Sequence, residues 1–336
     1  MIRVLVAGVI AMVISIIVGP RFIAFLRRNE FGAHIREELP ERHGEKQGTP
    51  TMGGLLILVV ATIAFLSVSK YKVPALTVLF VTLGCGAIGF LDDFIKLTHR
   101  RSLGLRGRWK LILLALITVG VAFAARHQDL PTSVFIPVVH WNLELSWGWY
   151  VLLFLVIAGT ANGVNLADGI DGLAAGTGII SLITYTAIAV VTYIRSGNPG
   201  GRFDSRLDLA IVGAALIGAT IGFLWYNAFP AEVIMGDTGA MALGGALAAF
   251  AIFTKTVFLL LLIGGIFAIE ALSVIIQVVA FRYWGRRVFL IAPIHHHFEM
   301  KAWSDTKIMV RFWIVTAILC AIGFALFYRD FTFFRR

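Results

Sequence analysis

Acidic side chains stand at the ends of long apolar stretches in three separate parts of this chain. The five residues are Asp92, Asp93, Asp168, Asp171 and Asp237. A carboxylate is costly beside lipid and usually faces a polar cavity, so each one is a candidate for a functional site. Mg²⁺ prefers oxygen ligands and typically combines one or two carboxylates with substrate phosphates. The pattern therefore predicts one assembled metal and phosphate site.

The first pair, Asp92 and Asp93, has two interpretations. Adjacent residues on an α-helix point about 100° apart, so one carboxylate is expected to face a metal or basic group and the other to face substrate. The alternative is a solvated helix end whose acids pair with Lys96 or Arg100. The segment alone does not decide between them.

The second segment places a polar residue at every third position, so that successive side chains are neighbours on a helical or 3₁₀ turn. These residues are Asn162, Asn165, Asp168 and Asp171. The interleaved glycines let the backbone approach a ligand closely. A merely capped turn would leave four polar residues beside lipid unexplained, so we predict that this segment binds substrate.

The third segment runs from Asn227, a candidate substrate ligand, to Asp237 in a Gly-Asp-Thr-Gly motif. Asp237 is either the N-cap of the following helix or a metal ligand, and the other acids favour the ligand. Cations suited to an anionic substrate occur at Lys46 and Lys110. The triplet His295, His296 and His297 has no thiol near it, so hydrogen bonding to phosphate, or orienting of the acids, fits it better than a transition metal.

The composition describes a membrane protein. Of 336 residues, 59% are hydrophobic and 14% charged, and the mean hydropathy is +0.87. Such a chain spans a bilayer as a bundle of helices, and we interpret residues 1–336 as a single integral-membrane domain. The net charge of +10 comes from Lys and Arg spread over loops, which follows the positive-inside rule and gives no reason to expect a nucleic-acid partner.

Ten transmembrane helices are expected at about 20 residues per crossing. Basic residues gather after the first, third and ninth helices, which predicts cytoplasmic loops there and both termini outside. The acids and the His triplet then share the cytoplasmic face. A short external β-hairpin is expected between Thr132 and Trp147, turning near Asn142. The predicted helices are 3–26, 52–69, 74–92, 109–125, 149–162, 172–194, 208–225, 239–254, 256–281 and 308–328.

Taken together, these motifs resemble the phospho-N-acetylmuramoyl-pentapeptide-transferase (MraY) branch of the polyprenyl-phosphate N-acetylhexosamine-1-phosphate transferases. The resemblance covers nearly the whole chain and rests on an ordered set of motifs. They are Lys46 with Gly-Thr-Pro-Thr-Met-Gly-Gly, Leu-Asp-Asp-Phe from Leu91, Asn-Leu-Ala-Asp-Gly-Ile-Asp-Gly-Leu from Asn165, Met-Gly-Asp-Thr-Gly from Met235, and Pro-Ile-His-His-His-Phe-Glu from Pro293. The His-His-His-Phe-Glu motif looks like this branch in particular.

The resemblance implies a reaction in the bacterial inner membrane: UDP-N-acetylmuramoyl-pentapeptide and undecaprenyl phosphate give lipid I and UMP, with Mg²⁺, as the first membrane step of peptidoglycan synthesis. By position, Asp237 looks like the Mg²⁺ ligand and a catalytic residue. Asp92, Asp93 and His296 match further catalytic positions, and the remaining candidates match substrate-binding positions. It also implies a homodimer and a bend in the ninth helix, which Gly264-Gly265 would permit.

Two other functions remain open on sequence. A transferase of GlcNAc-1-phosphate to the same lipid would share the acidic motifs. A proton-coupled permease also keeps carboxylates inside its bundle, but it predicts acids near the middle of the membrane. A scaffold without catalysis leaves the polar residues between Asn162 and Asp171 unexplained.

Overall fold

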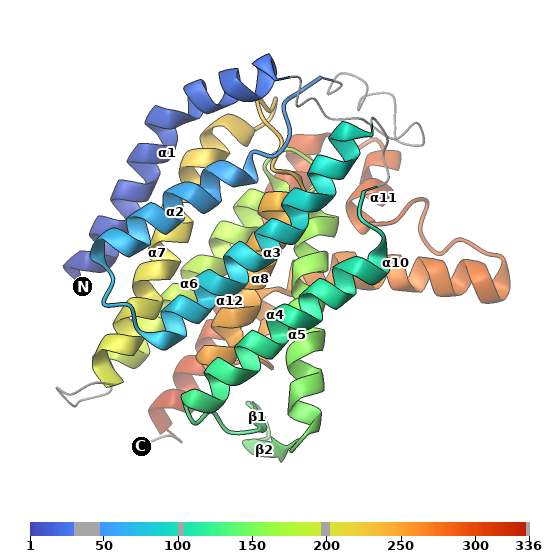
Figure 1. Cartoon of the computed structure of the whole chain (residues 1–336). Helices are drawn as coiled ribbons and strands as arrows, with labels where there is room; N and C mark the ends of the chain where they lie inside the picture. The colour runs from blue at the N-terminus through green and yellow to red at the C-terminus, as the bar shows by residue number, and fades with distance from the viewer. Residues whose placement is uncertain (30–47, 100–103, 196–201, 334–336) are drawn as a thin grey trace.

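The computed structural model describes residues 1–29, 48–99, 104–195 and 202–333, and these form a helical bundle with one small hairpin (Figure 1). Apolar runs become helices because a helix satisfies its own backbone hydrogen bonds in lipid. The elements are α1 Ile2–Arg28, α2 Gly54–Val68, α3 Val73–Thr98, α4 Gly107–His127, β1 Ser133–Ile136, β2 Trp141–Glu144, α5 Gly148–Ala167, α6 Leu173–Arg195, α7 Arg202–Asn227, α8 Gly236–Phe253, α9 Leu260–Ile263, α10 Gly265–Trp284, α11 Ile294–Met300 and α12 Asp305–Phe333.

The expected polytopic helical fold is confirmed. Within the described ranges, nine helices are long and apolar enough to cross a membrane, and the 15-residue α2 is a shorter apolar helix. The main differences from the predicted bounds are at α3, which continues to Thr98, and α5, which continues to Ala167. The prediction stopped each of these spans at its polar residues. In the structure Asp92 and Asp93 of α3 bond to other segments, whereas Asn162 of α5 bonds within its own helix.

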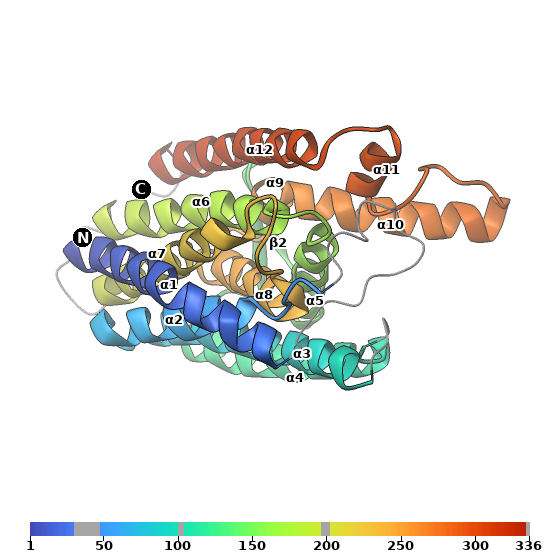
Figure 2. The same cartoon turned by 90° about the horizontal axis from the view of Figure 1, so that it is seen from above.

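The ninth predicted span is interrupted, as the family resemblance implied, at the two glycines that permit it. Helix α9 ends at Ile263, and α10 begins at Gly265. The N–H of Gly264 still donates to the carbonyl of Leu260, at 2.8 Å. Beyond this break α10 leaves the bundle and extends past the other helices, as both views show (Figures 1 and 2).

The hairpin is present, but the prediction of its turn was wrong. Strands β1 and β2 are antiparallel, and Asn142 lies within β2, opposite Phe135. The turn falls at residues 137–140, where Pro137 fixes its own φ and the N–H of His140 donates to the Pro137 carbonyl at 3.2 Å. Because Pro137 cannot donate to the strand ladder, it follows the end of β1 and belongs to the turn.

Helix α8 lies at the centre of the bundle. Every residue from Thr238 to Phe253 is buried, and α8 packs against α2, α3, α5 and α6. Glycines make the closest of these approaches possible. A Cβ on Gly89 of α3 would lie 2.1 Å from the carbonyl oxygen of Asp237, and one on Gly54 of α2 would lie 2.1 Å from the nitrogen of Gly239. Small residues thus bring α2 and α3 onto the start of α8.

Both ends of the described chain lie on the side of the bundle that carries the hairpin (Figure 1). The C-terminal part of α3 and the first turn of α8 meet at the opposite side, which we call the acidic end. The prediction that the termini share a side is thereby confirmed.

Candidate active site

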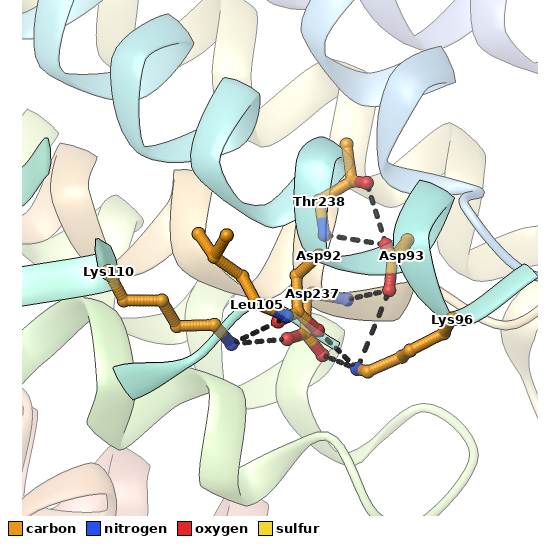
Figure 3. A network of polar contacts seen from close by, with 7 residues as sticks. All are labelled: Asp92, Asp93, Lys96, Leu105, Lys110, Asp237 and Thr238. Carbon is orange, nitrogen blue, oxygen red and sulfur yellow. Dashed lines mark hydrogen bonds and ion pairs between the residues drawn. The ribbon is translucent and has the colours of Figure 1, made fainter. Parts of the chain in front are cut away.

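Three carboxylates converge at the acidic end, around two lysines (Figure 3). Lys96 Nζ lies 2.6 Å from Asp92 Oδ2, 3.0 Å from Asp237 Oδ1 and 3.9 Å from Asp93 Oδ1. Lys110 Nζ lies 2.9 Å from an oxygen of Asp92 and 2.9 Å from one of Asp237. Residues from α3, α4 and α8 therefore form one charge cluster, which we call the acidic cluster.

Asp93 holds the start of α8 in place. Its carboxylate accepts the backbone N–H of Asp237 at 3.2 Å, and the N–H and hydroxyl of Thr238 at 3.0 and 2.7 Å. The first N–H groups of a helix have no partner inside it, and a negative charge there is favourable. Asp93 thus caps α8 from another helix, and the side chain of Asp237 is left to face the lysines. The N-cap alternative for Asp237 was wrong.

Asp92 is held by the segment that leads into α4. Its Oδ1 accepts the backbone N–H of Leu105 at 2.7 Å, and a Cβ on Gly104 would lie 2.4 Å from the same carboxylate. The close passage of Gly104 lets the chain wrap around Asp92, and one turn of α4 later Lys110 reaches it. The helix end is not solvated, because Asp92 is 2% exposed, but the pairing with Lys96 that this alternative predicted is present.

Replacing Thr238 with Val should weaken the cap on α8. The substitution keeps the shape but removes the hydroxyl that donates to the buried Asp93. We expect a loss of about 1–3 kcal/mol in the free energy of unfolding. Turnover should also fall, because the position of Asp237 depends on this cap. Thermal unfolding in detergent measures the first effect. A matched control is Thr118→Val in α4, whose hydroxyl donates to the Leu114 carbonyl of its own helix; equal losses in the two variants would contradict this role.

Asp168 lies beside the acidic cluster, just past the end of α5. Its carboxylate accepts the backbone N–H of Gly236, the residue before Asp237. Burial raises the pKa of Asp168 well above its usual value, and the nearby charges of Asp237, Asp93 and Asp171 raise it further. The second and third acidic segments therefore meet, as the shared-site prediction required.

Asp171 and Asn227 join the loops around this site. Asp171 Oδ2 accepts the N–H of Ala231 at 3.1 Å. Asn227 Oδ1 accepts the N–H of Gly172 at 3.1 Å, and its Nδ2 donates to the Val233 carbonyl at 2.9 Å. Gly172 has φ +73°, where a side chain would be strained. In this structure Asn227 uses both of its polar atoms within the protein.

Asn162 and Asn165 occupy the last two turns of α5. Asn162 Nδ2 donates to the Ala158 carbonyl at 2.8 Å, and the Asn165 carbonyl accepts the N–H of Asp168 at 3.3 Å. Both side chains are partly exposed.

The Gly-Thr-Pro-Thr-Met-Gly-Gly loop also reaches the acidic end. The N–H groups of Gly53 and Gly54 donate to the carbonyls of Ile234 and Met235, each at 2.9 Å. At Gly236, φ is +74°, and a Cβ there would lie 2.7 Å from Asp93 and 3.0 Å from the hydroxyl of Thr51. The loop therefore packs on the segment that presents Asp237. Lys46 itself lies outside the described residues.

The three histidines on α11 have different surroundings. His295 is fully buried, and its Nδ1 lies 3.0 Å from Glu270 Oε1. His296 Nδ1 pairs with Glu299, and its ring centroid is 4.1 Å from that of His295. His297 Nδ1 accepts the N–H of Leu290 at 3.1 Å. Burial, together with the charge of Lys301, lowers the pKa of His297.

Lys96, Thr238 and Glu299 belong to these contacts but were not predicted as site residues. Lys96 follows Asp92 by four residues and Asp93 by three, a spacing that makes Lys96 a neighbour of each carboxylate on the helix surface. This spacing was visible in the sequence, but we used it only in the alternative of a solvated helix end. Nothing in the local sequence links Thr238 to Asp93, because the two are 145 residues apart.

The acidic cluster has the chemistry for a hard divalent cation. One ligand oxygen from each of Asp92, Asp93 and Asp237 can be chosen so that all three lie within 4.8 Å of one another. Three carboxylates against two ammonium groups leave one net negative charge. Oxygen donors of this kind suit Mg²⁺. These residues therefore fit the cofactor that the family resemblance implies.

The fold and this cluster place the chain in a class of polytopic membrane enzymes. The profile described as "Glycosyl transferase family 4" matches residues 75–255, more than half of the chain. That stretch contains the acidic cluster, both lysines and the segment from Asn162 to Asp171. A second profile, "Phospho-N-acetylmuramoyl-pentapeptide-transferase signature 1", matches residues 46–58, a range that includes Thr51, Gly53 and the start of α2.

Individual relatives define the family more closely. A phospho-N-acetylmuramoyl-pentapeptide-transferase from Rubrobacter xylanophilus is 45% identical, over 98% of each chain. Proteins of the same name from Geobacillus thermodenitrificans and Halalkalibacterium halodurans are 44% identical over 95% of this chain and 96% of theirs, and 43% identical over 94% of each. The chain belongs to the phospho-N-acetylmuramoyl-pentapeptide-transferase family.

Proposed function

We propose that this protein transfers phospho-N-acetylmuramoyl-pentapeptide from its UDP derivative to undecaprenyl phosphate, releasing UMP and forming lipid I. One observation carries the proposal beyond family membership. Asp92, Asp93 and Asp237, from separate parts of the chain, meet two lysines at one end of a membrane bundle. Such a cluster binds phosphates and a divalent cation where a soluble and a lipid substrate meet.

The proposed mechanism is direct attack by the lipid phosphate on the β-phosphate of the nucleotide. A phosphate monoester has its second pKa at about 6, so the lipid phosphate is largely dianionic at neutral pH and needs no strong base. What the reaction needs is in-line placement and neutralisation of charge. The bond to the UMP phosphate breaks as the new P–O bond forms.

The residues of the chain have separate roles in this mechanism. Asp237 would hold the metal ion, and Asp93 fixes Asp237 by capping α8. Lys96 and Lys110 neutralise phosphate oxygens. A bound Mg²⁺ would supply further charge stabilisation of the phosphoryl group. Asp92, held by Leu105 and both lysines, orients the lipid phosphate, while Asp168, His296 and His297 face the nucleotide-sugar.

A covalent scheme, in which an Asp attacks the nucleotide first, makes a different prediction. It requires UMP release and a phosphosugar-labelled protein when the lipid is absent. Direct attack requires neither. Trapping such an intermediate by mass spectrometry would overturn the proposed mechanism.

The reaction itself is tested by following UMP release from UDP-N-acetylmuramoyl-pentapeptide in detergent. We expect release only when undecaprenyl phosphate and Mg²⁺ are both present, loss of release on adding EDTA, and recovery with excess Mg²⁺, because the acidic cluster needs a hard cation to hold the phosphates. UDP-GlcNAc should give little product. Equal rates with UDP-GlcNAc would assign the chain to the alternative transferase, and substrate uptake without UMP would favour the permease.

The acidic end is proposed to face the cytoplasm of a bacterial inner membrane. The basic residues around it, at the ends of α3 and α10, support this through the positive-inside rule. Cysteine labelling at the hairpin, accessible from outside intact cells, would agree with it. The family resemblance also supports a homodimer, and light scattering in detergent distinguishes one chain from two.

A further inference from the structure

A carboxylate and an imidazole pair with each other inside the bundle, near the break between α9 and α10. Glu270 and His295 are each 0% exposed, and Glu270 Oε1 lies 3.0 Å from His295 Nδ1. The other oxygen of Glu270 and the Nε2 of His295 are also buried and have no hydrogen-bond partner among the described residues. Two unsatisfied buried atoms in one pair call for an explanation.

Stability alone does not explain the pair. Burying a carboxylate costs free energy that its partner repays only in part, and a well-packed apolar pair is often as stable. A carboxylate accepts hydrogen bonds and cannot donate them while it is ionised, so Nδ1 of His295 carries the proton. Glu270 thereby fixes the imidazole tautomer and leaves Nε2 as the free acceptor.

The Nε2 atom of His295 packs against the turn that follows α5. A Cβ on Gly169 would lie 2.2 Å from His295 Nε2, so the imidazole touches the backbone there. The preceding residue, Asp168, accepts the N–H of Gly236, and Asp237 follows directly. A continuous set of contacts thus runs from α10 to the acidic cluster.

We infer that Glu270 is a positioning residue that acts through His295: it holds the imidazole against Gly169 and so sets Asp168 relative to the acidic cluster. Because Glu270 stands on the helix that leaves the bundle (Figure 2), the pair also ties the acidic end to that helix. The effect on turnover rests on the proposed function.

A double-mutant cycle tests the inference. Glu270→Gln keeps the length but removes the charge. His295→Asn keeps an N–H for Glu270 and removes the ring atom at Gly169. Each should lower kcat by about tenfold to a hundredfold and leave both KM values nearly unchanged, because neither group need touch substrate. The double variant should be no slower than the slower single variant. The inference would be overturned if the loss of kcat in the double variant equalled the product of the two single losses. An unchanged kcat in Glu270→Gln would also overturn it.

Gly169→Ala tests the contact between His295 and the backbone without any change at Glu270. Its new methyl group would displace Nε2, so kcat should fall as in Glu270→Gln, and the fall should vanish in the His295→Asn background. Gly159→Ala in α5, where a Cβ would meet no atom of the described residues within 4 Å, is the matched control. Ser273→Ala controls for packing around Glu270, since the Ser273 hydroxyl donates to the Glu270 carbonyl. An equal loss of kcat in either control would contradict the inference.

Nitrogen NMR of labelled histidine separates this inference from the proposed function. In the unaltered protein His295 should carry its proton on Nδ1, and Glu270→Gln should mix the tautomers, whether or not UMP is released. A proton on Nε2 in the unaltered protein would overturn the inference even if the transferase reaction is established.

Discussion

Replacing Asp237 with Asn should abolish UMP release and leave the protein folded. The side chain keeps its size, and its backbone N–H still donates to Asp93. What is lost is the carboxylate that both lysines contact and that we propose as the metal ligand. Metal coordination is worth several kcal/mol at a phosphoryl centre, so a fall of at least about a thousandfold in kcat is expected. Mn²⁺ binding, followed by electron paramagnetic resonance, should weaken in parallel.

Asp204→Asn is the matched control for that substitution. Asp204 lies on α7 and pairs with Lys70 at 2.9 Å, away from the acidic cluster. Removing this partly exposed carboxylate changes the net charge by the same amount, and turnover should stay within about twofold because such pairs contribute little. If Asp237→Asn retained a tenth of the normal rate with unchanged Mn²⁺ binding, the proposed metal site would be wrong.

The acidic cluster could be predicted from the sequence because each of its carboxylates lies at the end of an apolar run, where burial of a charge costs free energy. A carboxylate beside lipid must face a cation or a polar cavity. In the predicted topology an even number of crossings separates Asp92, Asp168 and Asp237 from one another, so all three lie at the same end of the bundle. The break at Gly264 was expected from the family resemblance, and the two adjacent glycines permit it, since glycine weakens a long helix.

Other features depended on contacts that local sequence does not carry. Asp93 caps helix α8 through the N–H of Asp237, which lies 144 residues later in the chain. Leu105 reaches Asp92 only because Gly104 allows the backbone to pass close to that carboxylate. The partner of His295 is Glu270, on a different helix. Helix ends were also underestimated at α3, whose polar last turns bond to other segments, and at α5, where Asn162 bonds within its own helix. The hairpin turn was misplaced because Asn142 was taken as the turn residue and Pro137 was not considered.

The position of the acidic cluster also bears on the permease alternative. Charges that carry a proton through a membrane are expected near its midplane, on broken helices. Here Asp92 and Asp93 lie in the last two turns of α3, and Asp237 in the first turn of α8. The broken helix α9–α10 carries Glu270, which contacts His295 and lies outside the acidic cluster. The geometry favours chemistry at a membrane surface.

Gly89→Ala should force α3 away from the start of α8 and so disrupt the acidic end. Its Cβ would lie 2.1 Å from the Asp237 carbonyl oxygen, 2.4 Å from the Asp237 carbonyl carbon and 2.6 Å from the Thr238 nitrogen, all backbone atoms. The two helices must therefore separate, which should cost about 3 kcal/mol or more in unfolding free energy. A shift of about 1 Å between catalytic groups can cost about a hundredfold in rate, so UMP release should also fall by at least that factor.

Gly84→Ala, on the same helix, distinguishes this steric effect from a general intolerance of α3 to alanine. Its Cβ would meet the Ile117 side chain, at 2.9 Å from Cδ1. That methyl group can rotate away, and alanine is about 1 kcal/mol better than glycine inside a helix, so stability and rate should be nearly unchanged. Thermal unfolding and UMP release measured on both variants decide the matter. Equal behaviour would mean that the close contact of α3 with the start of α8 does not position Asp92 and Asp93 against Asp237.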